Sequence, residues 1–232
     1  MIKENIACVK KMMLNACNKS GLNPDDVTLI AVSKTKPVSM MQEAYDTGIR
    51  DFGENKVQEI VKKYDEMPKD TKFHMIGHLQ TNKVKMLVDK VYMIHSVDSL
   101  HLAEVISKEA VKINKVIPVL IEVNVAEEES KYGITVKECE ELVRACSVLP
   151  GIQIKGLMTI APYVENGDEN RKYFQALKQL SVDIMQKNID NVSMEFLSMG
   201  MSGDYEVAVE EGASFIRVGT GIFGEREYQL KE

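Results

Sequence analysis

The chain of 232 residues lacks tryptophan, has only four cysteines and six prolines, and contains no long apolar run. No stretch approaches the roughly 18 residues that a membrane-spanning helix needs, and Met1–Asn5 does not begin a signal-peptide pattern. Cys8, Cys17, Cys139 and Cys146 form no CxxC pair. This is not the pattern of a disulfide-stabilised secreted domain. We therefore expect a cytoplasmic protein that has no membrane partner.

An excess of positive charge is also missing. The chain has 29 Lys+Arg against 35 Asp+Glu, a formal net charge of -6, so we expect no nucleic-acid partner. The prolines are scattered, and no low-complexity stretch or Pro/Gly-rich linker divides the sequence. With 44% hydrophobic residues, the composition suits one domain over residues 1–232.

Short β-rich apolar runs alternate with longer amphipathic segments. The expected strands are Val27–Ser33, Ile49–Phe52, Phe73–Ile76, Val91–His95, Val116–Val123, Ile152–Thr159, Val192–Ser198 and Ser214–Val218. The expected helices are Lys3–Lys19, Ser39–Thr47, Asn55–Met67, Asn82–Val88, Ser99–Asn114, Val136–Leu149, Asp168–Lys187 and Asp204–Glu211. Strand–helix alternation predicts a parallel sheet. Eight strands in about 230 residues favour an α/β fold of the closed (β/α)8, TIM-barrel type with an extra N-terminal helix. The alternative is an open doubly wound sheet, although no GxGxxG follows the first strand.

Barrel enzymes and binding proteins place their chemistry at the carboxyl ends of the strands. Lys34 follows the first apolar strand directly, in the segment Ser33–Pro37. A lysine in partly apolar surroundings loses part of its preference for the charged form. The neutral amine is the form that makes a Schiff base with an aldehyde. The alternative role for Lys34 is an ordinary strand-end lysine that reaches solvent.

Two segments rich in glycine and hydroxyl groups follow the last two strands. Ser198–Asp204 reads SMGMSGD, and Arg217–Gly224 reads RVGTGIFG. Backbone N–H groups and hydroxyls in such turns bind anions, and barrels often hold phosphate after strands seven and eight. The sequence therefore predicts a phosphate site formed by both segments.

Pyridoxal 5'-phosphate is an aldehyde that carries a phosphate, so it would use both features. Arg217 lies between them and could donate to the pyridine nitrogen, which the permanently charged guanidinium would keep unprotonated. That would weaken the ring as an electron sink. The alternative for Arg217 is a salt bridge to Glu122 or Glu195.

Two further segments after strands have weaker signals. Asn55 stands at the expected start of a helix, where its ordinary role is an N-cap. His74 and His78 are four residues apart, but Gly77 lies between them and no third ligand is near in the sequence. We therefore expect no metal site there.

The order of these motifs resembles that of a known family. The chain looks like a pyridoxal phosphate homeostasis protein, a group of single-domain relatives of the alanine racemase barrel, from about Ile2 to Phe223. The motifs that carry the resemblance are Ala31–Pro37, Phe52–Asn55, Phe73–Lys83, Gly156–Ile160, Ser198–Asp204 and Arg217–Gly224.

The resemblance implies a role for each candidate residue. Lys34 would bind the cofactor covalently, and Arg217 would meet the pyridine nitrogen. Asn55 would lie close to the ring. The phosphate would be held by the set Ser202, Gly219 and Thr220, with Ser198 or the Met199 backbone nearby. It also implies a cofactor carrier or buffer that affects vitamin B6 and amino-acid balance and is not an enzyme, with apoenzymes as recipients.

Two enzymes remain as alternatives. One is a PLP-dependent amino-acid racemase or lyase. By the resemblance, racemases carry a second domain and a tyrosine base, whereas only Gly224–Glu232 follow the last strand here. We expect Tyr205 to pack in a helix and Tyr228 to lie in a tail, so that neither supplies the second base. The other alternative is a cofactor-free barrel enzyme acting on a sugar phosphate. We expect a monomer.

Overall fold

Eight parallel strands close into a barrel in which each strand pairs with its neighbours in the sequence, β1 through β8. The computed structural model describes residues 1–225. The strands are β1 (Thr28–Val32), β2 (Asp51–Glu54), β3 (Lys72–Met75), β4 (Val91–Val97), β5 (Ile117–Glu122), β6 (Ile152–Met158), β7 (Val192–Met201) and β8 (Phe215–Val218). β8 pairs with β1 in the register Ile30↔Arg217 and closes the ring. The predicted barrel is confirmed, and the open sheet is wrong.

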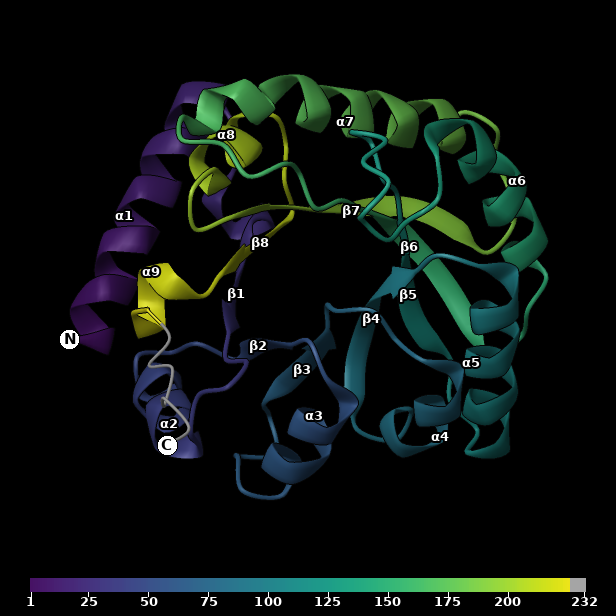
Figure 1. The fold of residues 1–232 in the computed structure, drawn as a ribbon, viewed down its shortest axis with the longest axis horizontal. Coiled ribbons are helices and arrows are strands. Elements are labelled where there is room, and N and C mark those ends of the chain that lie inside the picture. The colour runs from purple at the N-terminus through teal and green to yellow at the C-terminus, as the bar shows by residue number, and fades with distance from the viewer. Residues whose placement is uncertain (226–232) are drawn as a thin grey trace.

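Helices enclose the ring of strands on its outside, as Figure 1 shows. They are α1 (Ile2–Ser20), α2 (Val38–Asp46), α3 (Val57–Tyr64), α4 (Val84–Leu87), α5 (Leu100–Lys112), α6 (Val136–Ser147), α7 (Arg171–Met185), α8 (Tyr205–Glu210) and α9 (Thr220–Phe223). Short 3-10 turns precede β1 (Pro24–Asp26), α4 (Thr81–Lys83) and α7 (Gly167–Asn170). The short α9 was not predicted, because its first residues read as a glycine-rich turn.

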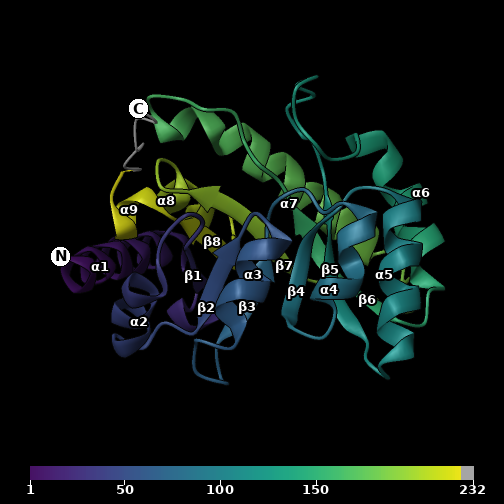
Figure 2. The same ribbon diagram turned by 60° about the horizontal axis from the view of Figure 1, so that its bottom comes forward.

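The expected extra helix is α1, which packs on the outside where the barrel closes. It contacts α2, α8 and α9 and lies at the opposite end of the molecule from α5 and α6 (Figure 2). Its buried face includes Ile2, Ile6 and Val9. The Asn5 side-chain amide donates to the Ile222 carbonyl at 2.9 Å. α1 thus covers the strand ends that carry two of the candidate site segments.

Apolar side chains fill two separate layers. The larger lies between the strands and the helices. A smaller cluster fills the barrel interior and consists of Ile30, Met93, Leu120, Met158 and Phe215. Alternate strand residues face these two layers. Polar residues in phase with the inner cluster therefore point into the barrel, which is the case for Arg217, two residues after Phe215.

Local capping explains two helix starts, and one predicted cap is wrong. Ser99 caps α5 by accepting from the Leu102 N–H, and Thr135 begins α6 with a capping box that includes Glu138. Asn55 does not cap α3, because the helix begins two residues later and Lys56 occupies the N-cap position without a side-chain hydrogen bond.

Candidate functional site

Lys34 lies in the turn directly after β1, with its side chain half-buried. Hydrogen bonds hold the backbone of the residues on both sides of Lys34. The Thr35 N–H donates to Glu59 Oε2 at 2.7 Å, and the Ser33 carbonyl accepts from Lys63 Nζ at 2.9 Å. Thr35 has a φ of 64°, which is unusual for a β-branched residue. The predicted position of Lys34 at the strand end is confirmed, and its role stays a prediction.

Lys36 ties this turn to the last helix. Its Nζ donates to the carbonyl oxygens of Phe223, Gly224 and Glu225 at 3.1, 3.3 and 3.0 Å. Carbonyls at the end of a helix have no partner within the helix, so a lysine there satisfies them. The loops after β1 and β8 are therefore joined.

The two segments expected to hold phosphate come together. β7 continues to Met201, past the predicted end at Ser198, so the turn begins at Ser202. Ser202 Oγ accepts from the backbone N–H groups of Gly219 and Gly221, each at 3.3 Å. Thr220 is exposed at the start of α9. Hydroxyls and backbone N–H groups gathered in this way suit a phosphate.

Gly221 has no room for a side chain, and Gly219 lies in ordinary contact with β1. A Cβ on Gly221 would lie 2.9 Å from Val218 Cγ1, and one on Gly219 would lie 3.4 Å from Val32 Cβ. Distances below about 3.4 Å force the neighbour to move. Val32 ends β1 two residues before Lys34. We call the group formed by Ser202, Gly219, Thr220 and Gly221 the glycine cradle. The glycine cradle and the candidate lysine therefore occupy neighbouring strand ends of one barrel rim.

Arg217 is buried inside the barrel, with 4% of its surface exposed. Nη1 donates to Ser198 Oγ at 2.6 Å and Nη2 to the Thr159 carbonyl at 2.8 Å. No salt bridge joins it to Glu122 or to Glu195, so that alternative is wrong. Glu195 instead pairs with Lys155 at 3.2 Å on the outside, because the strand alternation places it there.

Burial lowers the pKa of Arg217 to about 10, against the opposing charges of Asp204 and Glu122. The guanidinium is therefore still charged at neutral pH. Two of its five N–H donors are used by Ser198 and Thr159. It is an electropositive donor inside an apolar barrel, and it can bind an acceptor such as an unprotonated ring nitrogen.

A buried acidic residue near Arg217 was missed as a site residue. Burial, together with the nearby charge of Asp98, raises the pKa of Glu122 to about 7, and Arg217 opposes the shift. Glu122 Oε2 has no hydrogen-bond partner among the described residues. Burial also raises the pKa of Asp98. Glu122 is the last residue of β5 and Asp98 follows β4 directly, so both carboxyls lie at carboxyl ends of strands.

The remaining predicted residues, Ser198, Met199 and Asn55, lie at two places in the barrel. The Ser198 hydroxyl faces Arg217, while the Met199 side chain is fully buried in the outer core layer. Only the Met199 backbone remains for the site. Asn55 lines an open pocket of about 690 Å³ that includes His78 and Lys83. A Cβ on Gly77 would lie 2.6 Å from the Asn55 carbonyl oxygen, so the β3 loop supports Asn55 closely.

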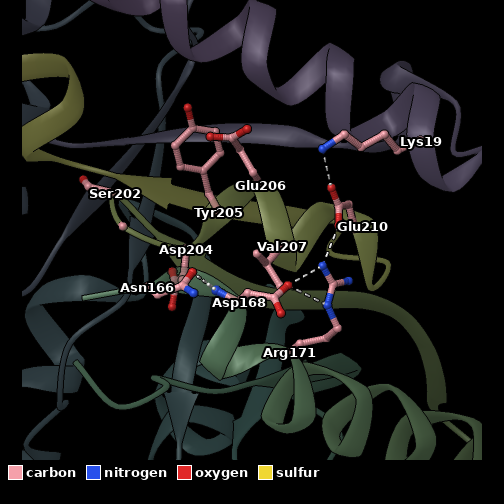
Figure 3. A pocket seen from close by; sticks show the side chains of 12 residues that line it. Lys19, Asn166, Asp168, Arg171, Ser202, Asp204, Tyr205, Glu206, Val207 and Glu210 are labelled. Carbon is pink, nitrogen blue, oxygen red and sulfur yellow. Dashed lines mark hydrogen bonds and ion pairs between the residues drawn. The ribbon is translucent and has the colours of Figure 1, made fainter. Parts of the chain in front are cut away.

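A second pocket, of about 340 Å³, lies beside Ser202 on the outer side of the barrel. Figure 3 shows Ser202 at one edge, with Arg171 and Glu210 at the other. Arg171 pairs with Asp168, Glu210 and Glu211. Because carboxylates already neutralise its cation, this pocket does not offer a phosphate site comparable with the glycine cradle.

His74 and His78 have different surroundings, although they are only four residues apart in the sequence. His74 is buried and meets His95 at 2.9 Å, whereas His78 stacks on Tyr132 with ring centroids 3.9 Å apart. No group of three or more metal-ligating side chains occurs within residues 1–225. Proximity of His74 to His95 could not be found in the sequence, since the two lie on different strands.

The sequence matches the family described as "Alanine racemase, N-terminal domain" over residues 2–227. It is 45% identical over 226 residues to the pyridoxal phosphate homeostasis protein of Aquifex aeolicus, with 97% of this chain and 98% of that one covered. This chain belongs to the pyridoxal phosphate homeostasis protein family. The family member of Escherichia coli is 36% identical over 234 residues, with 99% of each chain covered.

Solved structures agree with the family. PipY of Synechococcus elongatus, solved with PLP bound, has a TM-score of 0.83 and 35% identity, and 97% of this chain and 100% of PipY are covered. An alanine racemase of Corynebacterium glutamicum has a TM-score of 0.74 at 14% identity. This chain is fully covered there but spans 63% of the racemase, and that likeness concerns the fold alone.

Proposed function

We propose that this member of the pyridoxal phosphate homeostasis family holds pyridoxal 5'-phosphate as a Schiff base on Lys34. It acts as a carrier or buffer of the cofactor and thereby affects amino-acid balance. The observation that supports the proposal is the contact of Gly219 with Val32, the last residue of β1, two residues before Lys34. Relatives at 45% and 36% identity bear the homeostasis name, and PipY was solved with PLP bound.

Each group at this rim fits one part of the cofactor. The Ser202 hydroxyl and the N–H groups of Gly219 and Thr220 suit the phosphate. Buried Arg217 suits the pyridine nitrogen and keeps it unprotonated, because the guanidinium holds its own proton. As the family resemblance implies, Asn55 is proposed to lie near the ring, and Ser198 with the Met199 backbone near the cradle.

The cofactor, when bound, supplies an aldehyde to the lysine. The neutral Lys34 amine forms the carbon–nitrogen double bond and gives up two hydrogens, and the aldehyde oxygen leaves with them as water. The Thr35 N–H bonds Glu59 in the turn around Lys34, and the Lys34 side chain is half-buried. No oxidant or second reactant is needed.

We propose that the protein does not turn over amino acids. Racemisation by two bases requires a proton-transferring group on each face of the cofactor. Tyr205 packs in α8 with 8% exposure, as predicted, and burial raises its pKa to about 12. It therefore keeps its proton at neutral pH and is a poor base. Tyr228 lies outside the described residues.

The proposed setting is the cytoplasm. Residues 1–232 are proposed to act as one monomeric PLP-binding domain that passes cofactor to PLP-dependent apoenzymes, with no nucleic-acid or membrane partner. Within residues 1–225, every helix is too short or too polar to span a bilayer. The net charge of -6 disfavours nucleic acid as a partner.

An absorbance spectrum of the purified protein, before and after incubation with pyridoxal phosphate, tests the cofactor. Borohydride reduction and peptide mapping then test its attachment. We expect a visible absorbance band and a label on Lys34, both lost in Lys34→Ala. Lys56→Ala, an exposed lysine at the same rim, is the control and should keep both. A colourless, unlabelled wild-type protein would contradict the proposal and favour a cofactor-free enzyme acting on a sugar phosphate.

Exchange of the amino-acid α-hydrogen in deuterated water separates carrier from enzyme. The carrier predicts no steady exchange or product from a panel of amino acids. Steady turnover that disappears in Lys34→Ala would instead establish the racemase or lyase alternative.

A further inference from the structure

Five polar side chains cross the barrel interior in a single chain of hydrogen bonds. Arg217 Nη1 bonds Ser198 Oγ at 2.6 Å, and Ser198 Oγ bonds His95 Nδ1 at 2.9 Å. His95 Nε2 bonds His74 Nδ1 at 2.9 Å, and His74 Nε2 bonds Asp51 Oδ1 at 2.9 Å. The chain joins the candidate cofactor site on β8 to the first residue of β2, at the other end of the barrel.

With both rings neutral, the Asp51 end fixes the direction of every bond. The Asp51 carboxylate only accepts, so His74 donates to it from Nε2 and accepts at Nδ1. His95 then carries its hydrogen on Nε2, donates to His74 Nδ1 and accepts at Nδ1 from the Ser198 hydroxyl. A guanidinium only donates, so Ser198 Oγ accepts from Arg217 with a lone pair, which is consistent with this direction.

The surroundings favour the neutral rings that this direction requires. His74 and His95 are fully buried, and the Phe215 ring lies 5.6 and 5.3 Å from them. Burial lowers the pKa of His74, with Lys72 adding to the shift and Asp51 opposing it. Burial also lowers the pKa of His95, with further contributions from His74 and Arg217.

A second proton on His74 would disturb this arrangement. With His95 as the Nε2–H tautomer, a protonated His74 Nδ1 would face the His95 N–H at 2.9 Å. With both rings neutral, the only charges within the chain of bonds are at its ends, Arg217 and Asp51. The Asp51 side chain is 15% exposed, so the negative end remains in contact with water.

We propose that Asp51, His74 and His95 are positioning residues for the cofactor site: they hold the Ser198 hydroxyl so that its lone pair faces Arg217, and thereby fix the guanidinium. This inference rests on the proposed function, in which Arg217 meets the pyridine nitrogen. Without His95 the Ser198 hydroxyl is free to rotate its hydrogen towards Arg217, which removes the acceptor and loosens the guanidinium. Asp51 acts from the far end of the barrel by fixing the His74 tautomer.

The first test examines the hydrogen bonds without any cofactor. Nitrogen-15 NMR of histidine-labelled protein should show His74 and His95 as neutral Nε2–H tautomers. They should stay so through the range around pH 6.5 in which an ordinary histidine takes up a proton. The exposed His101 is the internal control for histidine labelling. An Nδ1–H tautomer or protonation at either buried ring would overturn the proposal.

The second test asks whether Arg217 is fixed by the chain. Affinity is measured for pyridoxal phosphate and for its 1-deaza analogue, in which carbon replaces the ring nitrogen. The wild type should prefer pyridoxal phosphate by about tenfold, as expected for a hydrogen bond to a charged donor. Asp51→Leu and His74→Leu should reduce that preference by about threefold or more, with little change in the affinity for the analogue.

Conservative and matched variants distinguish positioning from folding. Asp51→Asn keeps an acceptor for His74 and should retain more of the preference than Asp51→Leu. Asp70→Leu removes an exposed carboxylate that bonds Arg50 and Tyr45 near the start of the same strand, and should leave the preference unchanged. A full preference in Asp51→Leu and His74→Leu would overturn the positioning role alone. No preference in the wild type would overturn the role of Arg217 as well, and failure to bind pyridoxal phosphate would overturn the proposed function.

Discussion

Lys63 Nζ lies 2.7 Å from Glu54 Oε1, and the two side chains are only 6% and 0% exposed. The same ammonium lies 2.8 Å from Glu59 Oε2 and donates to the Ser33 carbonyl at 2.9 Å. The Ser33 hydroxyl also donates to Glu54 at 2.7 Å. This buried ion cluster fastens β2 and α3 to the turn that presents Lys34.

Lys63→Met should be strongly destabilising because it leaves Glu54 buried without its cation. Breaking a buried ion pair in this way costs about 3–5 kcal/mol. Denaturant unfolding of both proteins measures the loss. Lys62→Met is the matched control on the same helix, and as an exposed position it should change stability by less than about 0.5 kcal/mol. Equal losses in the two variants would show that the cluster contributes nothing specific.

Glu122 should make stability fall with rising pH. Its pKa is raised from 4.5 to about 7 in the fold, so the folded state holds a proton that the unfolded state releases first. The resulting stability is present below the unfolded pKa and is lost as pH rises through the folded pKa. The Glu122→Gln side chain does not titrate. The free energy of unfolding of this variant, relative to that of the wild type, should therefore increase by about 2–3 kcal/mol between about pH 5 and pH 8.

Unfolding free energies of wild type and Glu122→Gln at both pH values check this difference. Glu195→Gln serves as control, since Glu195 lies on the outside with 49% of its side chain exposed. A pH-independent difference between wild type and Glu122→Gln would show that the carboxyl is ionised normally in the fold.

Ser202→Ala should weaken cofactor binding without preventing attachment to Lys34. The hydroxyl joins the two glycine turns and is proposed to contact the phosphate, so its loss removes about 1–2 kcal/mol, or roughly a tenfold rise in Kd. A phosphate competition assay measures the change, and borohydride labelling should still find Lys34. Ser193→Ala, on β7 and with an unpartnered hydroxyl, should bind like wild type. An unaltered Kd in Ser202→Ala would remove Ser202 from the site.

Thiol reactivity should single out Cys8. All four cysteines are free and only Cys8 is exposed. Burial raises the pKa of Cys139 and of Cys146 to about 12, so their thiolate populations are negligible at neutral pH. A thiol reagent should modify one cysteine quickly in the native protein and all four after denaturation, with peptide mapping to identify the first. Rapid native modification of Cys139 or Cys146 would contradict the described burial.

The sequence was sufficient where a signal is local and repeated. Alternation of apolar strands and amphipathic helices predicted all eight strands, with ends that differ by a few residues. It also placed Lys34 at the first strand end and the glycine segments at the last two. A closed parallel barrel brings all its strand ends to one rim, so the proximity of these segments followed from the fold class.

Local signals failed where neighbouring strands decide the outcome. Asn55 has the residue type of an N-cap, yet the β3 loop at Gly77 packs against it and α3 begins later. β7 runs past Ser198 because its register with β8 shifts between Ser198 and Met201. Of the two glutamates considered as alternative partners for Arg217, Glu195 is placed on the outside by strand alternation, where it pairs with Lys155, and Glu122 forms no salt bridge with Arg217.

The sequence by itself determined the barrel and placed the candidate lysine and the candidate phosphate segments at strand ends, because periodicity and turn composition encode them within each strand–helix unit. Only the tertiary structure decided which polar groups meet inside. His74 meets His95, and Ser198 turns to Arg217, through the stagger of separate strands around the closed ring. Lys63 is buried where α3 packs against β2 and the end of β1. Contacts across a barrel depend on register and shear, which no single segment of the sequence contains.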